Sequence, residues 1–362
     1  MVLFARTLAF ITAALWCLAA TPGDCMDQPA IAPWYRNLGG AVSLRFDDGL
    51  ESHITTAIPL LNRYDYNATF LVNPGTERYR ARQDFWERQV PAMGHRLGNH
   101  TMNHRGARNI EDADYEIGEA ARTIWRIYPK ESKLLVFASG GGRILWGGKD
   151  WEQAAPAYRQ LVQKYHLIDL YDGKHPYLSV RSGMRTEDLC AQLGTTLDRR
   201  GHQAYVFHAI GSSSLFESLK TLVRGYGLTI KEETLAGLLR CLDERKHQLW
   251  VAPLIDILKY EQEAQGATIR LVSSGRRSET LALAVRTDPE LYDHLLTIVL
   301  PLRQGMAVVS VRQNDEPRPV YNDGSGDALA DVRPVNSTII VTYGAVRAGH
   351  KDRAATNSDE RD

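Results

Sequence analysis

Ala41-Val42-Ser43-Leu44-Arg45-Phe46-Asp47-Asp48-Gly49 is the stretch that decides the fold of this chain. Its first six residues form a short, mostly apolar run of the kind that predicts a β-strand, and the run ends in two acids. In folds built from alternating strands and helices, catalytic and ligand-binding groups gather at the carboxyl ends of parallel strands. We therefore expect Asp47 and Asp48 to face a site. A solvated turn is the alternative, since Asp-Gly is a common turn dipeptide.

The same pattern continues along the chain up to about Gln265, with helical periodicity between the apolar runs. The strand candidates are residues 41–46, 68–72, 96–99, 134–138, 166–170, 203–208 and 249–252. The helical candidates include residues 54–61, 115–127, 160–165, 186–197 and 235–242. This alternation predicts an α/β fold with a parallel sheet, either closed as a barrel or open and covered on both faces.

The sequence pattern changes after Gln265, where strand candidates alternate with turns rich in Gly, Ser, Asn, Asp and Pro. These candidates are residues 267–273, 280–287, 295–300, 306–313 and 338–343. We expect a barrel domain over residues 36–265 and a small antiparallel, sandwich-like accessory domain over residues 266–345. Residues 346–362 are polar and aperiodic, which is typical of a disordered tail.

Length and charge limit the classes of function. With 362 residues the chain is long enough for one barrel and a small appendage. Its 43 basic residues balance 43 acidic ones, so there is no basic field to attract nucleic acid. The hydrophobic share of 44% is that of an ordinary globular protein.

The first residues are those of an export signal. Arg6 precedes an apolar run from Leu8 to Ala20, and small residues follow. This order predicts a secretory signal peptide over residues 1–24 and a secreted or periplasmic protein, with a buried N-terminal helix as the alternative. A bilayer-spanning helix needs about 20 apolar residues, so we expect no stable membrane insertion once the signal is removed. Export makes a disulfide between Cys190 and Cys241 plausible.

A pair of histidines closes the third strand candidate, in Gly98-Asn99-His100-Thr101-Met102-Asn103-His104. On a helical turn, this four-residue spacing places both imidazoles on one face, where they can grip one ion. Two histidines and one carboxylate leave a coordination position open, as in catalytic metal sites. The pair by itself is weak evidence, and the Asp47-Asp48 pair strengthens it.

A third polar group ends the strand candidate at residues 203–208. Histidine titrates near neutral pH, so His208 is suited to protonate a leaving amine. The alternative is a core histidine whose hydrogen bonds are satisfied.

Phe46-Asp47-Asp48-Gly49, the His100-Thr101-x-x-His104 motif and His208 together resemble the polysaccharide deacetylase (NodB-homology) family of carbohydrate esterases, over roughly residues 39–264. The resemblance implies a distorted (β/α)7 barrel. It also implies that Asp47 is the catalytic base and His208 the catalytic acid. Asp48, His100 and His104 would then hold a divalent metal, usually zinc, with Co2+ as another option.

The third family motif departs from the pattern. Typical members carry Arg-Pro-Pro-Tyr-Gly, whereas this chain has Phe137-Ala138-Ser139-Gly140-Gly141-Gly142-Arg143. The motif's arginine, which steadies the base, is missing from its place. Arg143 is the candidate replacement, with a solvated loop residue as the alternative. The three glycines predict an open rim, and Asp169 and Asp172 are candidates for the family's Asp that orients the acid histidine.

The function implied by the resemblance is metal-dependent hydrolysis of N-acetyl, or O-acetyl, groups on an extracellular polysaccharide or oligosaccharide, with release of acetate. One alternative is an amidase for a small non-sugar amide, which gives no obvious reason for export. The other is a catalytically impaired carbohydrate-binding protein. The presence of all five chemical residues argues against it.

Overall fold

The computed structural model describes residues 28–140, 151–211, 227–322 and 327–345. The expected signal peptide, the expected tail and Arg143 lie outside these residues. Within them, no helix combines the length and the apolar character needed to cross a bilayer.

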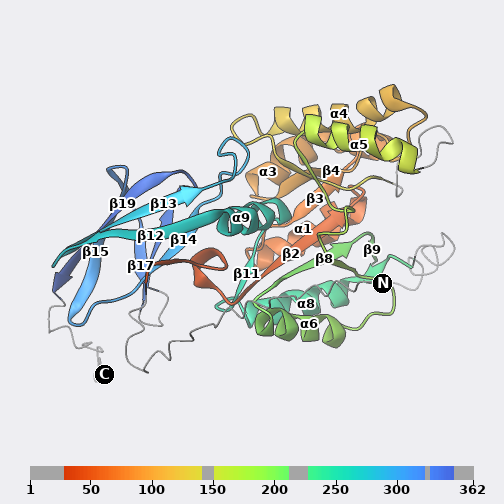
Figure 1. The fold of residues 1–362 in the computed structure, drawn as a ribbon. Helices are drawn as coiled ribbons and strands as arrows, with labels where there is room; N and C mark the ends of the chain where they lie inside the picture. The colour runs from red at the N-terminus through yellow and green to blue at the C-terminus, as the bar shows by residue number, and fades with distance from the viewer. Residues whose placement is uncertain (1–27, 141–150, 212–226, 323–326, 346–362) are drawn as a thin grey trace, which may run out of the picture.

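A curled sheet of eight parallel strands forms one half of the described molecule (Figure 1). Its strands are β2 (Gly40–Asp47), β3 (Thr69–Val72), β4 (Arg96–Asn99), β5 (Leu135–Phe137), β6 (Leu167–Asp169), β7 (Tyr177–Ser179), β8 (His202–Phe207) and β11 (Leu249–Val251). They follow the order β6-β5-β4-β3-β2-β8-β7, and β11 pairs with the first residues of β2. The expected barrel-like α/β fold is confirmed, because all seven expected strands are present and parallel. The short strand β7 is an addition that the sequence reasoning missed.

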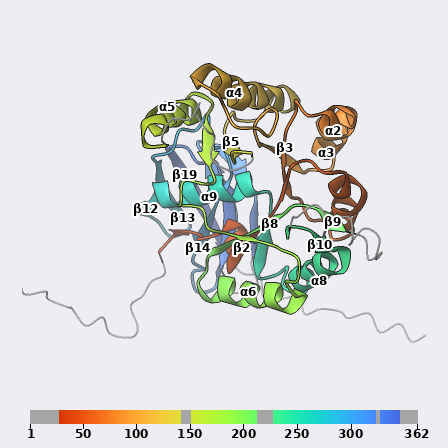
Figure 2. The same cartoon turned by 90° about the vertical axis from the view of Figure 1, so that its right-hand side faces the viewer.

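Helices cover the outer face of this sheet, α4 and α5 on one side and α6 and α8 on the other (Figure 2). The longer ones are α4 (Ile110–Ile127), α5 (Trp151–Lys164), α6 (Thr186–Asp198) and α8 (Glu232–Asp243). Shorter turns are η1 (Tyr35–Asn37), η2 (His53–Ala57), α1 (Ile58–Arg63), α2 (Glu77–Arg80), η3 (Phe85–Gln89) and α3 (Val90–Ala92). Alternate residues of β2, namely Val42, Leu44 and Phe46, share a buried core with these helices. By strand alternation, Ser43, Arg45 and Asp47 point to the opposite, inner face.

One helix lies against the inner face. In α9 (Leu254–Gly266), Leu254, Ile255 and Leu258 pack on Leu71 and Val136, which belong to the inner face of β3 and β5. Figure 2 shows α9 near the centre of the ring of elements. The helix therefore fills much of the interior that the curled sheet encloses.

Two antiparallel sheets form the other half of the molecule (Figure 1). One runs β1 (Ala30–Ile31), β14 (Leu296–Leu300), β18 (Ala328–Val332), β17 (Val320–Asn322). The other runs β12 (Ala267–Ser274), β13 (Ser278–Val285), β19 (Ser337–Ala345), β15 (Met306–Gln313), β16 (Glu316–Arg318). Side chains from both sheets share one buried core with Trp34, Trp250 and Tyr260. This core is thus continuous with the base of the parallel sheet.

A disulfide bond joins Cys190 of α6 to Cys241 of α8, with 5.9 Å between their Cα atoms. It closes a loop that contains β8 and the pair β9 (Ile210–Gly211) and β10 (Ile230–Lys231). The disulfide between Cys190 and Cys241 that the sequence made plausible is thus confirmed.

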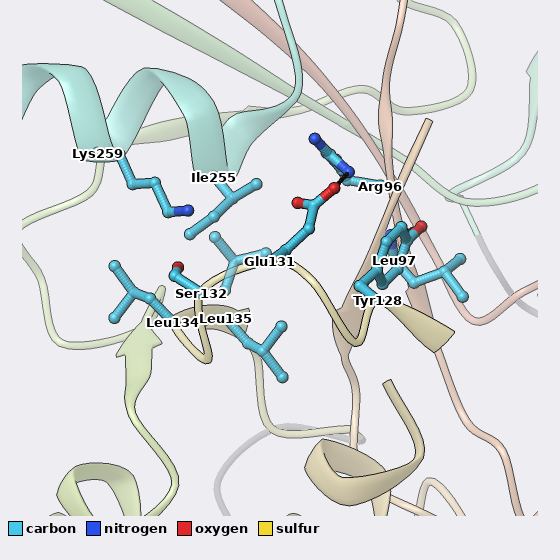
Figure 3. Close-up of a pocket in the computed structure, with 10 residues that line it drawn as sticks. Arg96, Leu97, Tyr128, Glu131, Ser132, Leu134, Leu135, Ile255 and Lys259 are labelled. Atoms are coloured by element: carbon cyan, nitrogen blue, oxygen red, sulfur yellow. Dashed lines mark hydrogen bonds and ion pairs between the residues drawn. The ribbon is translucent and has the colours of Figure 1, made fainter. Parts of the chain in front are cut away.

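A small cavity lies at the amino ends of β4 and β5, where Arg96, Leu135 and the α9 residues Ile255 and Lys259 line it (Figure 3). Its volume is about 30 Å³, room for a water molecule or two. Arg96 begins β4, whereas His100 follows the end of β4, so the cavity and the paired histidines lie at opposite ends of the strand. The cavity is too small for a sugar ring.

Candidate active site

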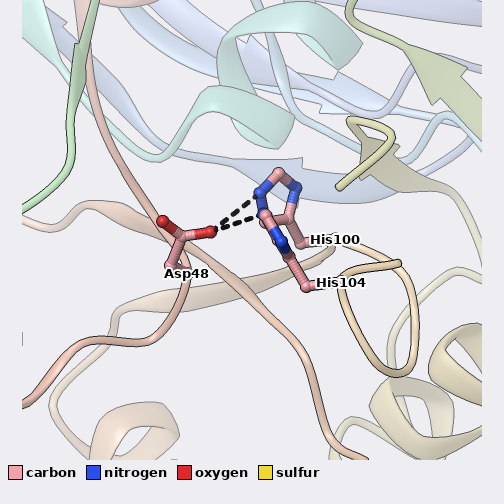
Figure 4. Close-up of side chains that lie close together, drawn as sticks. All are labelled: Asp48, His100 and His104. Carbon is pink, nitrogen blue, oxygen red and sulfur yellow. Dashed lines mark ion pairs between the residues drawn. The ribbon is translucent and has the colours of Figure 1, made fainter. Parts of the chain in front are cut away.

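Asp48, His100 and His104 converge at the carboxyl end of the parallel sheet (Figure 4). Asp48 Oδ1 lies 3.3 Å from His100 Nε2 and 2.9 Å from His104 Nε2. Each residue offers one ligand atom, and these atoms lie within 4.8 Å of one another. One carboxylate oxygen and two imidazole nitrogens can therefore contact a single ion, as expected from the sequence.

The backbone brings these side chains together through strained turns. Asp48 follows β2 and His100 follows β4, with β3 between the two strands. Asp48, Thr101 and His104 have φ values of 80°, 68° and 55°, in the left-handed region that residues other than glycine rarely adopt. The expected helical turn between the histidines is therefore wrong. Instead, an irregular loop with two left-handed residues, Thr101 and His104, directs the side chains of His100 and His104 toward Asp48. Such backbone strain is typical of functional sites.

The ring orientation of His100 fits a bound cation. Its Nδ1 lies 2.9 Å from the Ala138 carbonyl oxygen, which can only accept a hydrogen bond, so Nδ1 carries the proton. Nε2 of the ring therefore faces Asp48. Asp48 Oδ1 is buried and lies within reach of both imidazole Nε2 atoms. One carboxylate oxygen and two imidazole nitrogens that converge in this way form a donor set that suits zinc or another divalent ion.

The glycine after Ser139 packs directly against the metal ligands. A Cβ on Gly140 would lie 2.7 Å from the His100 carbonyl oxygen and 2.8 Å from His104 Cδ2. Gly140 is buried, so the prediction of an open rim is wrong at this position. The glycine permits close approach of the loop to the histidines. Gly141, Gly142 and Arg143 lie outside the described residues.

The expected base, Asp47, is held by an arginine that the sequence reasoning missed. Arg45 Nε donates to Asp47 Oδ1 at 2.7 Å and Arg45 Nη2 donates to Oδ2 at 2.5 Å. Both side chains are 1% exposed. Burial would raise the pKa of Asp47, but the Arg45 guanidinium and nearby histidines hold it below its ordinary value. Both residues lie on the inner face of β2, and this alternation was the signal that could have found Arg45.

His208 follows β8, the strand beside β2. Burial lowers the pKa of His208 and outweighs the attraction of Asp47 and Asp48, which raises it. Its buried Nδ1 has no hydrogen-bond partner among the described residues. The ring thus lies within the electrostatic reach of both carboxylates.

His53 fixes the backbone of His208. Its Nδ1 accepts a hydrogen bond from the Leu50 backbone N–H at 3.2 Å, so its Nε2 donates to the His208 carbonyl oxygen at 2.7 Å. Burial lowers the pKa of His53 to about 4, which keeps the ring neutral near pH 7. His53 therefore ties the loop after Asp48 to the end of β8.

The two candidates for an Asp that orients His208 make other contacts. Asp169 accepts hydrogen bonds from the Tyr158 hydroxyl at 3.0 Å and the Tyr171 N–H at 3.0 Å. Asp172 accepts one from the Lys174 N–H at 2.8 Å. These contacts hold the turn after β6, and none of them is made to His208.

Comparison with known proteins supports the resemblance drawn from the motifs. Residues 36–145 match the family model described as polysaccharide deacetylase. This segment contains Asp47, Asp48, His100 and His104. The resemblance is therefore confirmed over the part of the chain that carries four of the five predicted site residues. A curated relative, the gellan lyase of a Bacillus species, is 24% identical over 354 residues. The match covers 91% of this chain and 14% of the gellan lyase.

Solved structures that resemble the chain include several carbohydrate esterases of family 4. The polysaccharide deacetylase Bc1974 from Bacillus cereus is 17% identical, with a TM-score of 0.38, and the match covers 59% of this chain and 91% of Bc1974. A family 4 carbohydrate esterase from Streptomyces lividans in complex with acetate is 16% identical, with a TM-score of 0.37 and coverage of 60% and 94%. The family 4 pseudoenzyme BA3943 from Bacillus anthracis is 15% identical, with a TM-score of 0.32 and coverage of 54% and 65%.

Proposed function

From the resemblance to polysaccharide deacetylases over residues 36–145, we propose that this chain is a metal-dependent hydrolase that removes acetyl groups from a polysaccharide or oligosaccharide outside the cytoplasm. The proposal covers N-acetyl groups first and O-acetyl groups as the variant, and it assigns the reaction to residues 36–265. The sandwich over residues 266–345 would be an accessory domain, and the signal-like residues 1–24 support export.

One observation carries the proposal. Asp48 Oδ1 and the Nε2 atoms of His100 and His104 meet beside Asp47, at the end of the sheet where βα folds place their chemistry. Three ligands leave a coordination position open, whereas a structural zinc site is closed by four. The side chain of His104 is 30% exposed and that of His100 is 4% exposed, so the metal position opens to solvent on the His104 side.

Asp48, His100 and His104 would hold the metal, with zinc as the first choice and Co2+ as another divalent option. When bound, such an ion polarises the acetyl carbonyl and lowers the pKa of water.

Asp47 is suited to accept a proton from the attacking water. Each of its oxygens already accepts one hydrogen bond from Arg45, and each keeps further lone-pair capacity. The pairing keeps the carboxyl group in its charged, accepting form at neutral pH, because it lowers the pKa of Asp47.

His208 is suited to return a proton to the departing sugar nitrogen or oxygen. His53 fixes its backbone through the 2.7 Å hydrogen bond to its carbonyl oxygen. Water forms a C–O bond to the acetyl carbon and loses a proton to Asp47, and the acyl bond to the sugar nitrogen or oxygen breaks as protonated His208 gives its proton to the leaving group. Proton exchange with solvent then resets both residues, so acetate and a free amine or hydroxyl are the products.

The gellan lyase contributes nothing to this proposal. Its name gives a different reaction, and this chain spans only about 14% of its length.

The test is acetate release by the purified protein from acetylated chitooligosaccharides and from O-acetylated xylan, with metal content measured on the same samples. We expect about one divalent ion per chain and acetate release that a chelator stops and zinc restores. Asp47→Asn is the matched control, because it removes the base and leaves the three metal ligands in place. A metal-loaded protein that releases no acetate from either polymer would contradict the proposal.

A further inference from the structure

Arg45 and Asp47 form a closed two-point contact within one strand. Two roughly parallel N–H···O bonds, of 2.7 Å and 2.5 Å, join the guanidinium to both carboxylate oxygens. A pair of this geometry fixes the plane of the carboxylate as well as its position. A single hydrogen bond would leave the carboxylate free to rotate.

The strand that carries this pair is held on both edges. β2 pairs with β8 along Ala41–Phe46 on one edge, and with β11 and then β3 on the other. Arg45 itself is in register with Val206 and Thr69. The arginine therefore stands on the most constrained strand of the sheet, and its position does not depend on a loop.

Two tyrosines pack over the guanidinium of Arg45. The Tyr171 and Tyr177 ring centroids lie 5.7 Å from Arg45 Cζ, and the Tyr171 hydroxyl lies 3.3 Å from Arg45 Nη2. Residues Tyr171 and Tyr177 are 40% and 44% exposed, whereas Arg45 is 1% exposed. They shield the ion pair from water, which strengthens its charge-assisted hydrogen bonds. The short strand β7, which carries Tyr177, thereby has a part in the site.

We propose that Arg45 is the positioning residue for the catalytic base, and that it supplies from the same strand the guanidinium that the third family motif lacks in this chain. This inference rests on the proposed deacetylase function. Arg45 acts through Asp47 and takes no part in bond making. Its removal should therefore slow turnover and leave substrate affinity and metal binding unchanged.

The test uses Arg45→Ala and Arg45→Lys in the full-length, metal-loaded protein. Misplacement of a catalytic group by about 1 Å costs on the order of 100-fold in rate, so we expect that loss in kcat for Arg45→Ala and KM within about threefold of wild type. Arg45→Lys keeps a buried cation but cannot make the bidentate contact, so we expect an intermediate kcat. Added guanidinium or methylguanidinium should restore part of the kcat of Arg45→Ala and none of Arg45→Lys.

Arg303 provides a matched control. It pairs with Glu279 and lies over the Tyr343 ring, 4.4 Å from the centroid, in the sandwich. Arg303→Lys thus alters the same kind of ion pair and ring contact far from Asp47 in the fold. We expect its kcat to equal that of wild type.

Two results would overturn the inference. One is an Arg45→Lys enzyme with wild-type kcat. The other is a loss of kcat in Arg143→Ala that guanidinium rescues, with no such rescue in Arg45→Ala. If the wild-type protein binds metal but releases no acetate, the proposed function fails instead. A crystal structure of Arg45→Lys then decides the positioning role, because a rotated Asp47 carboxylate supports it and an unmoved one refutes it.

Discussion

Asp48 and His104 combine a ligand side chain with a left-handed backbone. Such a conformation costs on the order of 1 to 3 kcal/mol for a residue other than glycine, and it persists only where the surroundings fix it. A bound ion, shared by both residues, is a natural source of that support. The protein is therefore expected to gain stability when the metal binds.

Removing both imidazoles should abolish metal binding and activity together. In the double variant His100→Ala/His104→Ala, we expect metal content below about one tenth of wild type and loss of acetate release together, because one carboxylate cannot hold the ion. Elemental analysis after dialysis measures the first and an acetate assay the second. His247→Ala, at an exposed site, is the control. Full metal content in the double variant would refute the ligand assignment.

The adjacent acids Asp47 and Asp48 should differ under the same substitution. Asp47→Asn is expected to keep the metal and lose kcat by about 100-fold or more, because an amide cannot accept the proton. Asp48→Asn is expected to weaken metal affinity instead, since an amide oxygen is a poorer ligand than a carboxylate. Metal titration and kcat, measured on both variants, make the comparison. Equal metal affinity in the two variants would contradict it.

Glu263 gives a prediction about pH. The buried side chain accepts a 2.9 Å hydrogen bond from the His294 N–H, and Lys259, Asp293 and Asp256 are the charged groups near it. Burial raises the pKa of Glu263 from 4.5 to about 8. The folded protein thus holds a proton that the unfolded chain releases, so stability should fall as pH rises through that window.

Glu263→Gln removes this titration and is expected to be more stable than wild type near pH 8. Relative to the comparison at pH 5, the gain should be on the order of 3 kcal/mol, given about 1.4 kcal/mol for each unit of pKa difference and a pKa that rises from 4.5 to about 8. Chemical denaturation at both pH values measures it. A difference between variant and wild type that does not change with pH would refute the prediction.

Asp47, Asp48, His100, His104 and His208 were predicted as site residues because they lie at or near the ends of strand candidates and in motifs that resemble one family. The structure brings three of them together, Asp48, His100 and His104. The sequence also contained the information for Arg45, two residues before Asp47 and so on the same face of β2. Arg143 was expected instead, because it lies in the place of the third family motif. The role of His53 could not be predicted from the sequence. It depends on how close two backbone segments, at Leu50 and His208, lie to each other in the fold.

At the scale of elements, the covalent bond between α6 and α8 stands out. The helices lie side by side on the outer face of the sheet, and the linked cysteines are 51 residues apart in sequence. Cross-linking a loop of this length stabilises a fold by roughly 4 kcal/mol in the chain-entropy description. The loop contains β8, whose end carries His208.

The variant Cys190→Ser/Cys241→Ser should therefore lose stability by roughly 2 to 4 kcal/mol, with little change in metal content. Guanidinium unfolding with and without reductant is the measurement. Reductant is expected to shift the midpoint of wild type and not that of the variant. Identical wild-type midpoints in both conditions would show that the bond adds nothing.

The long elements were predictable and the short or doubly buried ones were not. All seven strand candidates of the parallel sheet and five of the sandwich appear as strands. β7, β16 and β17 have three residues each and lack the longer apolar run that marked the equally short β5, β6 and β11 in the sequence. α9 packs against both the parallel sheet and the sandwich, so its apolar residues do not form one stripe and its periodicity is weak.

At the scale of the whole molecule, the two halves share one core. Trp250 and Tyr260 belong to the chain of the barrel, yet they are buried among the apolar side chains of the sandwich. Ending the chain after Gly266 would uncover them together with Trp34, Ala41 and Ile257. The sandwich therefore covers apolar side chains that belong to the barrel.

We expect a chain that ends at Gly266 to aggregate or to remain partly unfolded, even though Asp47, Asp48, His100, His104 and His208 are all present. A large exposed apolar patch is an aggregation liability. Size-exclusion chromatography and near-UV circular dichroism would measure the outcome. A monomeric, cooperatively folded truncation with full metal content would contradict it.

The pairing of β1 with β14 has a consequence for synthesis. Ala30 pairs with Val299, so the first described strand, β1, cannot form its pairing until β14 has been synthesised. Ribosomes add about 5 to 20 residues per second, which leaves the nascent chain without this partner for on the order of tens of seconds. Contacts this distant in sequence also slow the final folding step. The sandwich can close only after β19, which ends at Ala345, has been translated, and until then the nascent chain stays without the core that joins its two halves.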